Sequence, residues 1–385
     1  MKQLKVLSVF GTRPEAIKMA PLIKKLDQQP QIKSNVCVTA QHREMLDQVL
    51  KIFSITPDYD LNIMKEKQTL NTITTEILVG LEKVLDESKP DVVLVHGDTS
   101  TTLAAALAAF YKKIPVGHIE AGLRTNDKYS PYPEEMNRTL VSNIADLHFA
   151  PTPKNKENLY KEGIKTNVYV TGNTVIDALQ HTVDKKYNFN NKKLRDINFS
   201  QKRSLLLTAH RRENLGKPLT NICNAVNKLV REFFDIQFII PVHLNPAVQR
   251  TIGSILRETP RVHLIDPLDV QDMHNLMDRS YLIMTDSGGL QEEAPSLGKP
   301  VLVLREETER PEAVEAGTVR LIGHNERKVC EVASDILSNI NKYNAMSKSI
   351  NPYGDGQASQ RIVQALLDRY FNNKINNFKD YIRAI

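Results

Sequence analysis

The sequence predicts an α/β protein made of two doubly wound, Rossmann-like domains that face a central cleft. Short apolar runs alternate with segments that carry apolar residues at helical spacing, which is typical of a parallel sheet covered by helices on both faces. This alternation stops and restarts once, near residue 203, and a length of 385 residues allows two or three domains. Ligands of such sheets bind at the carboxyl ends of the strands, so the cleft between two facing domains is the expected site.

Buried runs in the first half of the chain predict the first parallel sheet. The segments between these runs, such as 16–26 and 72–85, place apolar residues on one face of a helix. The expected strands are 4–10, 35–40, 91–96, 114–119, 147–150 and 168–171.

A second series of buried runs predicts the second sheet. The stretch 184–203, between the two series, is rich in Lys, Asn and Asp and is typical of a boundary loop. A glycine-containing turn at 354–356 precedes a last amphipathic helix over 358–370. The expected strands are 204–209, 237–242, 262–265, 281–285, 301–304 and 319–322. The expected domains are 1–175, 176–355, and a segment 356–385 made of a helix that packs back on the first domain and a polar tail.

The composition excludes several classes of protein. Apolar residues make up 41% of the chain and charged residues 25%, as in ordinary water-soluble globular proteins. The net charge of +6 mildly favours anionic partners, but the charges are interspersed and no basic run predicts nucleic-acid binding. The longest apolar run, 103–110, is too short for a membrane span, and 6–10 is too short for a signal sequence. We therefore expect a cytoplasmic protein with no nucleic-acid or membrane partner.

Cysteine and histidine spacing gives no sign of a metal site. Cys37, Cys223 and Cys330 lie far apart and form no CxxC pair, so neither a disulfide framework nor a cysteine zinc site is predicted. The chain also has no HExxH motif. We expect no metal.

The first strand ends in a loop that suits an anion. Gly11 permits a tight turn, Pro14 suits the start of a helix, and the free N–H groups of that helix attract negative charge. Arg13 and Lys18 add formal positive charge at the same place. Because the loop is not a GxGxxG fingerprint, we expect no nicotinamide cofactor.

Three carboxylates follow the ends of neighbouring strands in the first half. Asp98 follows the strand 91–96, Glu120 follows 114–119, and Glu134 comes shortly afterwards. Taken alone, each suits a structural role, and Asp98 suits a helix N-cap. Carboxylates that crowd together shift each other's pKa values and can divide the roles of acid and base. The sequence therefore predicts a cluster at one edge of the sheet.

The second half predicts a nucleotide-diphosphate site. The strand 281–285 leads into Ser287, Gly288 and Gly289, whose backbone N–H groups can approach a diphosphate at the start of a helix. Glu293, over a turn further along, can accept hydrogen bonds from ribose hydroxyls, as acidic residues do in dinucleotide folds. His210 and Arg211 follow the strand 204–209, and His243 follows the next one.

Taken together, these motifs resemble the non-hydrolysing UDP-N-acetylglucosamine 2-epimerases of bacteria. The resemblance runs in order from about residue 2 to 370, and its motifs are jointly very specific. DSGG alone indicates only the wider glycosyltransferase-B-like architecture. The motifs are GTRPEAIKMAPL, HGDTSTT, GHIEAGLRT, YSPYPEEMNR, TAHRREN, DSGGLQEEAPSLGKPVLVLR, TERPE and NPYGDG.

The resemblance implies an isomerase that interconverts UDP-N-acetylglucosamine and UDP-N-acetylmannosamine and uses no cofactor. The family's route eliminates UDP across C1–C2 to give 2-acetamidoglucal, then adds UDP back with protonation on the opposite face. Such a route requires a base, an acid and cations on the leaving diphosphate. A closed site must also exclude water, which would otherwise release free sugar.

The resemblance also assigns residues. The catalytic positions are Lys18, Asp98, Glu120, Glu134 and His210, with Asp98 or Glu120 acting on the C2 proton and His210 assisting departure of UDP. The UDP ligands are Arg13, His210, Met273, Ser287, Gly288, Gly289 and Glu293. A second UDP-N-acetylglucosamine, bound as an activator, would contact Gln41, His42, Lys67, Gln68, Glu134, Arg211 and His243.

Two positions depart from the family pattern. Lys67 stands where the family often has Arg, and Lys cannot make a bidentate phosphate contact, so activator binding is expected to be weaker. Met273 stands where an aromatic side chain commonly lies against uracil, although Met can still pack there. The resemblance further implies a homodimer and a product used for cell-surface polysaccharide.

Three other functions stay open from the sequence. Hydrolysing relatives release free N-acetylmannosamine and UDP, and the PEEMNR and HRREN contexts favour the non-hydrolysing branch over them. A UDP-sugar glycosyltransferase would need an acceptor groove and would leave the three carboxylates harder to explain. A non-catalytic nucleotide-sugar sensor would not need Asp98 and Glu120, and both are present.

Overall fold

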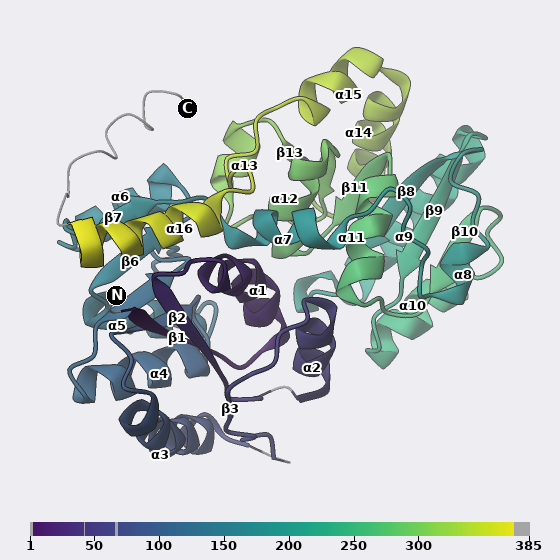
Figure 1. Cartoon of the computed structure of the whole chain (residues 1–385). Coiled ribbons are helices and arrows are strands. Elements are labelled where there is room, and N and C mark those ends of the chain that lie inside the picture. Colours follow the sequence, from purple (N-terminus) through teal and green to yellow (C-terminus); the bar gives the residue numbers. More distant parts are fainter. Residues whose placement is uncertain (1–2, 42, 66–67, 373–385) are drawn as a thin grey trace. The chain divides into compact units, whose positions relative to one another are not determined.

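The computed structural model describes residues 3–41, 43–65 and 68–372, which form two compact units (Figure 1). Unit 1 is Met1–His181 together with Gly354–Ile385, and unit 2 is Thr182–Tyr353. In each unit, helices cover both faces of a parallel sheet. The predicted fold class, two doubly wound α/β domains, is confirmed. Within the described ranges, no helix is long and apolar enough to cross a membrane.

In the described part of unit 1, seven strands pair in the order β3-β2-β1-β4-β5-β6-β7, and every pairing is parallel. The strands are β1 (Leu4–Phe10), β2 (Ile32–Val38), β3 (Tyr59–Asp60), β4 (Val92–His96), β5 (Val116–Ile119), β6 (Leu147–Ala150) and β7 (Val168–Val170). The helices are α1 (Arg13–Asp27), α2 (Arg43–Ile52), α3 (Leu70–Ser88), α4 (Ser100–Tyr111), α5 (Glu134–Ile144), α6 (Pro153–Lys161), α7 (Thr174–Thr182) and α16 (Ala358–Leu367). The order of the strands reverses between β1 and β4.

Apolar side chains on the two faces of this sheet form separate core layers. On one face α1, α2 and α16 pack against the strands, through residues such as Met19, Leu46 and Ile362. On the other face α3, α4 and α5 do so, through residues such as Ile77 and Val141. Because both faces are covered, the strands read as continuous apolar runs in the sequence.

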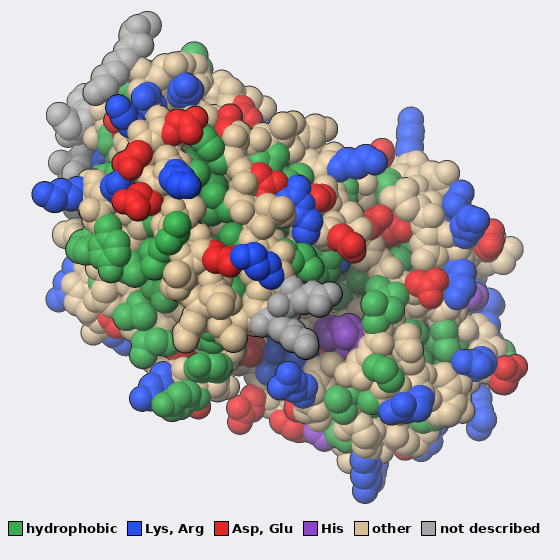
Figure 2. Space-filling view, turned by 90° about the horizontal axis from the view of Figure 1, so that it is seen from below, with side chains coloured by type: hydrophobic (Ala, Val, Ile, Leu, Met, Phe, Trp, Pro, Cys, Tyr) green, Lys and Arg blue, Asp and Glu red, His purple; other side chains and the backbone are tan. Residues whose placement is uncertain are grey.

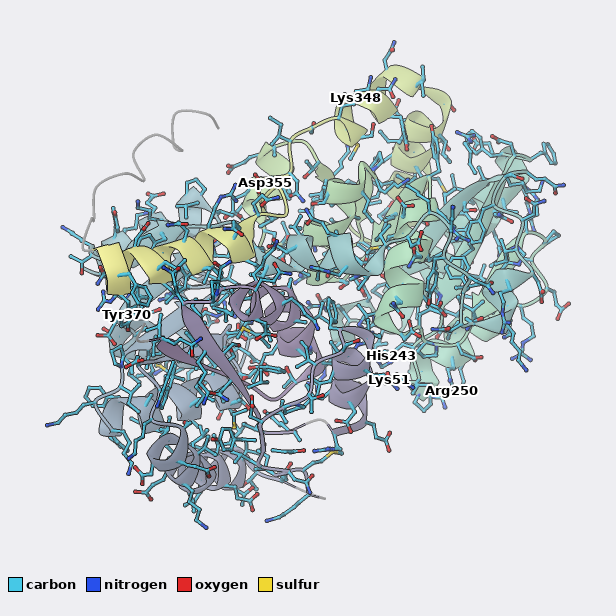
Figure 3. The ribbon with its side chains drawn as sticks, viewed as in Figure 1. Lys51, His243, Arg250, Lys348, Asp355 and Tyr370 are labelled. Atoms are coloured by element: carbon cyan, nitrogen blue, oxygen red, sulfur yellow. The ribbon has the colours of Figure 1, made fainter. Side chains whose placement is uncertain are left out.

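The last helix, α16, belongs to unit 1 although it follows unit 2 in the chain. Asp177 accepts hydrogen bonds from the first backbone N–H groups of α16, those of Ala358 (3.1 Å) and Ser359 (2.7 Å). Asp355 and Tyr370 mark its two ends in Figure 3, and the Tyr370 hydroxyl donates to the Asp91 carbonyl at 3.3 Å. A cap at one end and an anchor at the other hold α16 on the sheet.

In unit 2, where every residue is described, six parallel strands pair in the order β10-β9-β8-β11-β12-β13. The strands are β8 (Arg203–Thr208), β9 (Ile236–Pro241), β10 (Val262–Ile265), β11 (Leu282–Thr285), β12 (Val301–Val303) and β13 (Val319–Leu321). The helices are α8 (Lys192–Arg195), α9 (Lys217–Glu232), α10 (Pro246–Leu256), α11 (Val270–Arg279), α12 (Gly288–Glu293), α13 (Pro311–Glu315), α14 (Glu326–Ser338) and α15 (Ile340–Ser347). Its largest core layer packs α9, α10 and α14 on the sheet, and the strand order reverses between β8 and β11.

The structure differs from the sequence prediction mainly in three places, and the bounds of most other strands differ by one or two residues. The strand predicted over 35–40 is β2, which begins three residues earlier, and the short edge strand β3 was not predicted. The stretch 184–203 lies within unit 2 and contains α8, although its composition resembles a linker. It is held there because the buried Asp272 carboxylate accepts from the backbone N–H groups of Asn190 and Asn191, both at 2.8 Å. The compact units have their boundaries at 181/182 and 353/354. The domain boundaries expected from the sequence, at 175/176 and 355/356, stay a prediction.

Candidate active site

In each unit, the predicted site residues gather where the order of the strands reverses. In unit 1, the loops after β1 and β4 carry Arg13 and Asp98. In unit 2, the loops after β8 and β11 carry His210 and Ser287. Such points in a parallel sheet leave room at the strand ends for a ligand.

The buried carboxylate of Glu15 ties together the two loops at the reversal point of unit 1. It accepts from the backbone N–H groups of Gly11 (3.1 Å) and Thr12 (2.8 Å) in a capping box at the start of α1. It also accepts from the hydroxyls of Thr99 (2.7 Å) and Thr102 (3.2 Å) in α4 and its cap. Burial raises the pKa of Glu15, and these hydrogen bonds oppose that rise. The sequence reasoning missed this residue, although the spacing of Thr12 and Glu15 signals a capping box.

Glu120 is the centre of a charged cluster directly after β5. Its carboxylate pairs with the ammonium group of Lys18, from α1, and accepts from the amide of Asn173 at 3.0 Å. Its backbone lies in the left-handed region, with φ of 64°. A non-glycine residue held there costs free energy, and such positions are common at functional sites.

His96, the last residue of β4, lies beside this cluster. Its Nε2 atom is 3.7 Å from the Glu120 carboxylate and, among the described residues, has no hydrogen-bond partner. Burial lowers the pKa of His96 to about 4, so the imidazole is neutral at neutral pH. The sequence reasoning did not single out His96, whose signal is its place at a strand end, two residues before Asp98.

Asp98 is held by α5. Its carboxylate pairs with the buried guanidinium of Arg138, and its backbone carbonyl accepts from the amide of Asn137 at 2.8 Å. Burial raises the pKa of Asp98, Arg138 opposes the rise, and the nearby carboxylate of Glu120 adds to it. Asp98 is not the N-cap of α4, because Thr99 takes that place and accepts from the N–H of Thr102 at 3.1 Å.

The third carboxylate, Glu134, begins α5. Its Oε2 atom is buried, with no hydrogen-bond partner in the described part of the chain. Since Asn137 and Arg138 on the same helix contact Asp98, the structure brings α5 to the edge of the sheet that carries Asp98 and Glu120. Arg13, at the first position of α1, is partly buried.

In unit 2, the fully buried carboxylate of Asp286 fixes the loop after β8. It accepts from the backbone N–H groups of His210 (2.7 Å) and Arg211 (2.8 Å) and from the amide of Asn214 (3.0 Å). The imidazole of His210 stacks on that of His243, with ring centres 4.9 Å apart. Burial lowers the pKa of His210, against the attraction of Asp286. The sequence reasoning named the motif containing Asp286 but gave that residue no role.

The first glycine of the predicted diphosphate loop, Gly288, lies against Arg310. A Cβ added to Gly288 would be 2.6 Å from a guanidinium nitrogen of Arg310, so only glycine fits there without displacing that side chain. Arg310 is fixed by the Glu292 carboxylate at 2.6 Å, and the carboxylates of Glu292 and Glu309 help to raise its pKa. This arginine lies in the TERPE motif and was not assigned from the sequence.

The predicted ribose ligand Glu293 lies near α11, in the same unit. The imidazole Nε2 of His274 is 3.3 Å from the Glu293 carboxylate, and the other ring nitrogen bonds the Thr182 hydroxyl at 2.6 Å. Met273, the residue before His274, is partly buried on the same helix.

The residues expected to bind an activator are spread over both units. In unit 1, the amide oxygen of Gln41 accepts from the Thr101 hydroxyl at 3.2 Å, and the Gln68 amide donates to the Ile63 carbonyl. His42 and Lys67 lie outside the described residues. In unit 2, His243 is exposed at the end of β9, beside the start of α10, the helix that carries Arg250 (Figure 3).

Within the described ranges, no group of three or more His, Cys, Asp or Glu side chains is arranged to hold a metal ion. Unit 1 offers carboxylates that are paired with cations. Unit 2 offers backbone N–H groups, histidine and arginine. These groups suit proton transfer and diphosphate binding respectively.

Comparisons with known proteins agree on one family. A family model described as UDP-N-acetylglucosamine 2-epimerase matches residues 24–367. The UDP-N-acetylglucosamine 2-epimerase of Bacillus subtilis is 57% identical over 371 residues, covering 96% of this chain and 97% of the relative. That of Escherichia coli K12 is 54% identical over 381 residues, covering 97% of this chain and 100% of the relative.

A solved structure is also similar over nearly the whole chain. The UDP-GlcNAc 2-epimerase from Neisseria meningitidis bound to UDP-GlcNAc is 52% identical, with a TM-score of 0.85, and the match covers 95% of this chain and 100% of that one. The family model and both relatives extend through the carboxylate cluster of unit 1 and the glycine loop of unit 2. The chain therefore belongs to the UDP-N-acetylglucosamine 2-epimerases, a family of isomerases.

Proposed function

We propose that this enzyme interconverts UDP-N-acetylglucosamine and UDP-N-acetylmannosamine without net hydrolysis, by elimination and re-addition of UDP. The observation that carries the proposal is the pairing of two carboxylates with two cations at one sheet edge, Glu120 with Lys18 and Asp98 with Arg138. A neighbouring cation favours the ionised form of a carboxylate, which is the form that can accept a proton from C2. The N. meningitidis relative, which binds UDP-GlcNAc, supports the substrate.

The proposed reaction needs a group that accepts the C2 proton and a leaving group that takes up electrons. The C2 proton of the sugar is not adjacent to a carbonyl, so it leaves only if its electron pair is used elsewhere. In the proposed route a carboxylate takes that proton, the C–H electrons form the C1=C2 double bond, and the C1–O bond breaks with its electrons on UDP. Re-addition of UDP to C1, with a proton delivered to the other face of C2, gives the epimer.

The proposed roles follow from the position of each residue in its unit. Asp98 or Glu120 exchanges the C2 proton, Glu134 is a further catalytic residue, and Lys18 pairs with Glu120. In unit 2, His210 assists departure of UDP. The proposed UDP ligands are Arg13, His210, Met273, Ser287, Gly288, Gly289 and Glu293. Support for the diphosphate loop comes from Gly288, where backbone approaches an arginine too closely for a side chain.

NMR of the purified protein with UDP-N-acetylglucosamine in deuterated water tests the proposal. We expect UDP-N-acetylmannosamine that carries deuterium at C2, because the proton returned to C2 comes from a group that exchanges with solvent. Free N-acetylmannosamine as the main product would select the hydrolysing reaction instead. Turnover only after addition of an acceptor would select a glycosyltransferase, and binding with no turnover at all would select a sensor.

We propose a second UDP-N-acetylglucosamine as an activator, bound by Gln41, His42, Lys67, Gln68, Glu134, Arg211 and His243. In this proposal Lys67 weakens the binding of the activator, because a lysine binds phosphate only as a point charge and cannot make the bidentate contact of an arginine. Lys67→Arg should therefore lower the substrate concentration needed for half-maximal activation. Equal activation curves for the two proteins would contradict this role of Lys67.

We propose a homodimer, with a product used for cell-surface polysaccharide. Figure 2 shows hydrophobic side chains exposed on one face of unit 1, and α3, α4 and α5 expose Val79, Phe110, Tyr111, Met136 and Leu140. Exposed apolar side chains that gather on one face favour association with another chain. Sedimentation velocity should give the mass of two chains, and Tyr111→Glu should give that of one.

A further inference from the structure

The helix α5 contributes more to the site than its first residue, Glu134. Three later side chains of the same helix are buried and point toward Asp98 or toward its partner. Arg138 pairs with the Asp98 carboxylate through one terminal nitrogen and with the Glu135 carboxylate, at 3.1 Å, through the other. Asn137 donates to the Asp98 backbone carbonyl at 2.8 Å. Both the side chain and the backbone of Asp98 are therefore held by α5.

Glu135 connects this contact to the loop that follows Glu120. Its Oε2 atom holds Arg138, while its Oε1 atom accepts from the backbone N–H groups of Thr125 (3.1 Å) and Asn126 (3.0 Å). The side chains of Arg138 and Glu135 are only 6% and 5% exposed, so solvent does not compete for these contacts. Glu135 and Arg138 thus bridge the two loops that carry Asp98 and Glu120.

We propose that Arg138, oriented by Glu135, is the positioning residue that fixes the Asp98 carboxylate as the acceptor of the C2 proton. The inference rests on the proposed function, because it assigns to Asp98 the role of a base. Arg138 itself does not contact the reacting carbon in this scheme; it acts through Asp98.

The charges around Asp98 show why a cation is needed. Burial and the Glu120 carboxylate both raise the pKa of Asp98, while Arg138 and Lys18 lower it. The groups that face Asp98 are thus Arg138 from α5, Glu120 from the loop after β5 and Lys18 from α1. Loss of the largest favourable charge, that of Arg138, would leave a partly buried carboxylate whose pKa rises further.

The role can be tested by the pH dependence of C2 deuterium exchange in Arg138→Met and Arg138→Lys. In Arg138→Met we expect exchange at pH 7 to fall at least about 100-fold. We also expect the acid limb of its pH profile to move upward by about 1–3 units, the range by which a nearby arginine lowers the pKa of an aspartate. Arg138→Lys retains the charge but not the bridge to Glu135, so it should shift the acid limb less and restore part of the rate.

A buried arginine with a purely structural role would also reduce activity when replaced, but it would not move the acid limb. Arg203→Met is the matched control, because it removes an arginine paired with Asp235 at 2.7 Å at the start of β8, at the opposite end of that strand from His210. This variant should keep the wild-type pH profile. UDP affinity, measured by calorimetry, should be unchanged in all the variants.

A second measurement keeps the test independent of turnover. Carbon-13 NMR of protein labelled at aspartate carboxyls, with the Asp98 signal assigned from Asp98→Asn, gives the titration of that group directly. The signal should titrate at higher pH in Arg138→Met than in wild type, whether or not the wild type exchanges deuterium. If the wild type fails to exchange, the proposed function is wrong, and this titration still decides whether Arg138 controls Asp98. An unshifted titration of Asp98 in Arg138→Met overturns the inference, and Arg138→Gln, which also removes the charge, takes its place if Arg138→Met does not fold.

Discussion

Asp98→Asn and Glu120→Gln should each abolish incorporation of deuterium at C2, lowering it by about a thousandfold or more. General acid–base groups contribute roughly 10²–10⁴-fold to rate, and an amide of the same shape cannot take up the proton. Both replacements keep a hydrogen-bond acceptor for the cations that hold these carboxylates, Arg138 and Lys18. The fold of unit 1 should therefore persist, and UDP affinity should stay within about threefold of wild type, since in our account UDP is held mainly by unit 2.

Glu162→Gln is the control for these two variants. It weakens a different ion pair of unit 1, that between Glu162 and Arg124 at 2.6 Å, and removes a carboxylate outside the candidate site. Exchange in this control should be close to wild type. Wild-type exchange in both Asp98→Asn and Glu120→Gln would show that the proton at C2 is moved by other groups.

Asp286→Ala should lower the free energy of unfolding by about 3 kcal/mol, much more than replacement of a surface carboxylate of unit 2. The change leaves three donors, on His210, Arg211 and Asn214, without their acceptor in a fully buried place. The backbone of His210 is then no longer fixed, so UDP should also bind at least about tenfold more weakly. Urea unfolding followed by fluorescence or circular dichroism, and calorimetric titration with UDP, measure the two effects.

The matched control replaces a carboxylate of unit 2 that lies on the surface. Asp235→Ala removes a partly exposed ion pair with Arg203, and exposed pairs contribute only about 0–1 kcal/mol. Its UDP affinity should equal that of wild type. Similar losses of stability for Asp235→Ala and Asp286→Ala would contradict the assigned role of Asp286.

Much of the fold could be predicted because the strands of a covered parallel sheet appear as short, mainly apolar runs. The ranges 4–10, 147–150 and 262–265 agree with β1, β6 and β10 residue for residue. The carboxyl ends of such strands must lie at one edge of a sheet, which is why Asp98 and Glu120 could be expected together. The structure places both in one electrostatic cluster.

The remainder depended on partners that are distant in sequence. The strand β3 has only two residues and is defined by its pairing with β2. Two residues are too few to show the pattern of apolar residues by which a strand is predicted. Asp98 is held by Arg138, which lies far from it in the sequence. Gly288 is likewise packed against the distant Arg310. The polar stretch 184–203 is fixed by a carboxylate of α11. Such contacts depend on how helices pack on the sheet, which local composition does not specify.

The central claim is that UDP leaves C1 while the carboxylates of unit 1 exchange the C2 proton. It is tested most directly with UDP-N-acetylglucosamine that carries oxygen-18 in the bridge between C1 and the β-phosphorus, followed by phosphorus-31 NMR. If the C1–O bond breaks, the oxygens of the freed β-phosphate become equivalent, and the account predicts that label moves from the bridge to non-bridging positions during epimerisation. Epimerised product in which all of the label stays in the bridge would contradict the account.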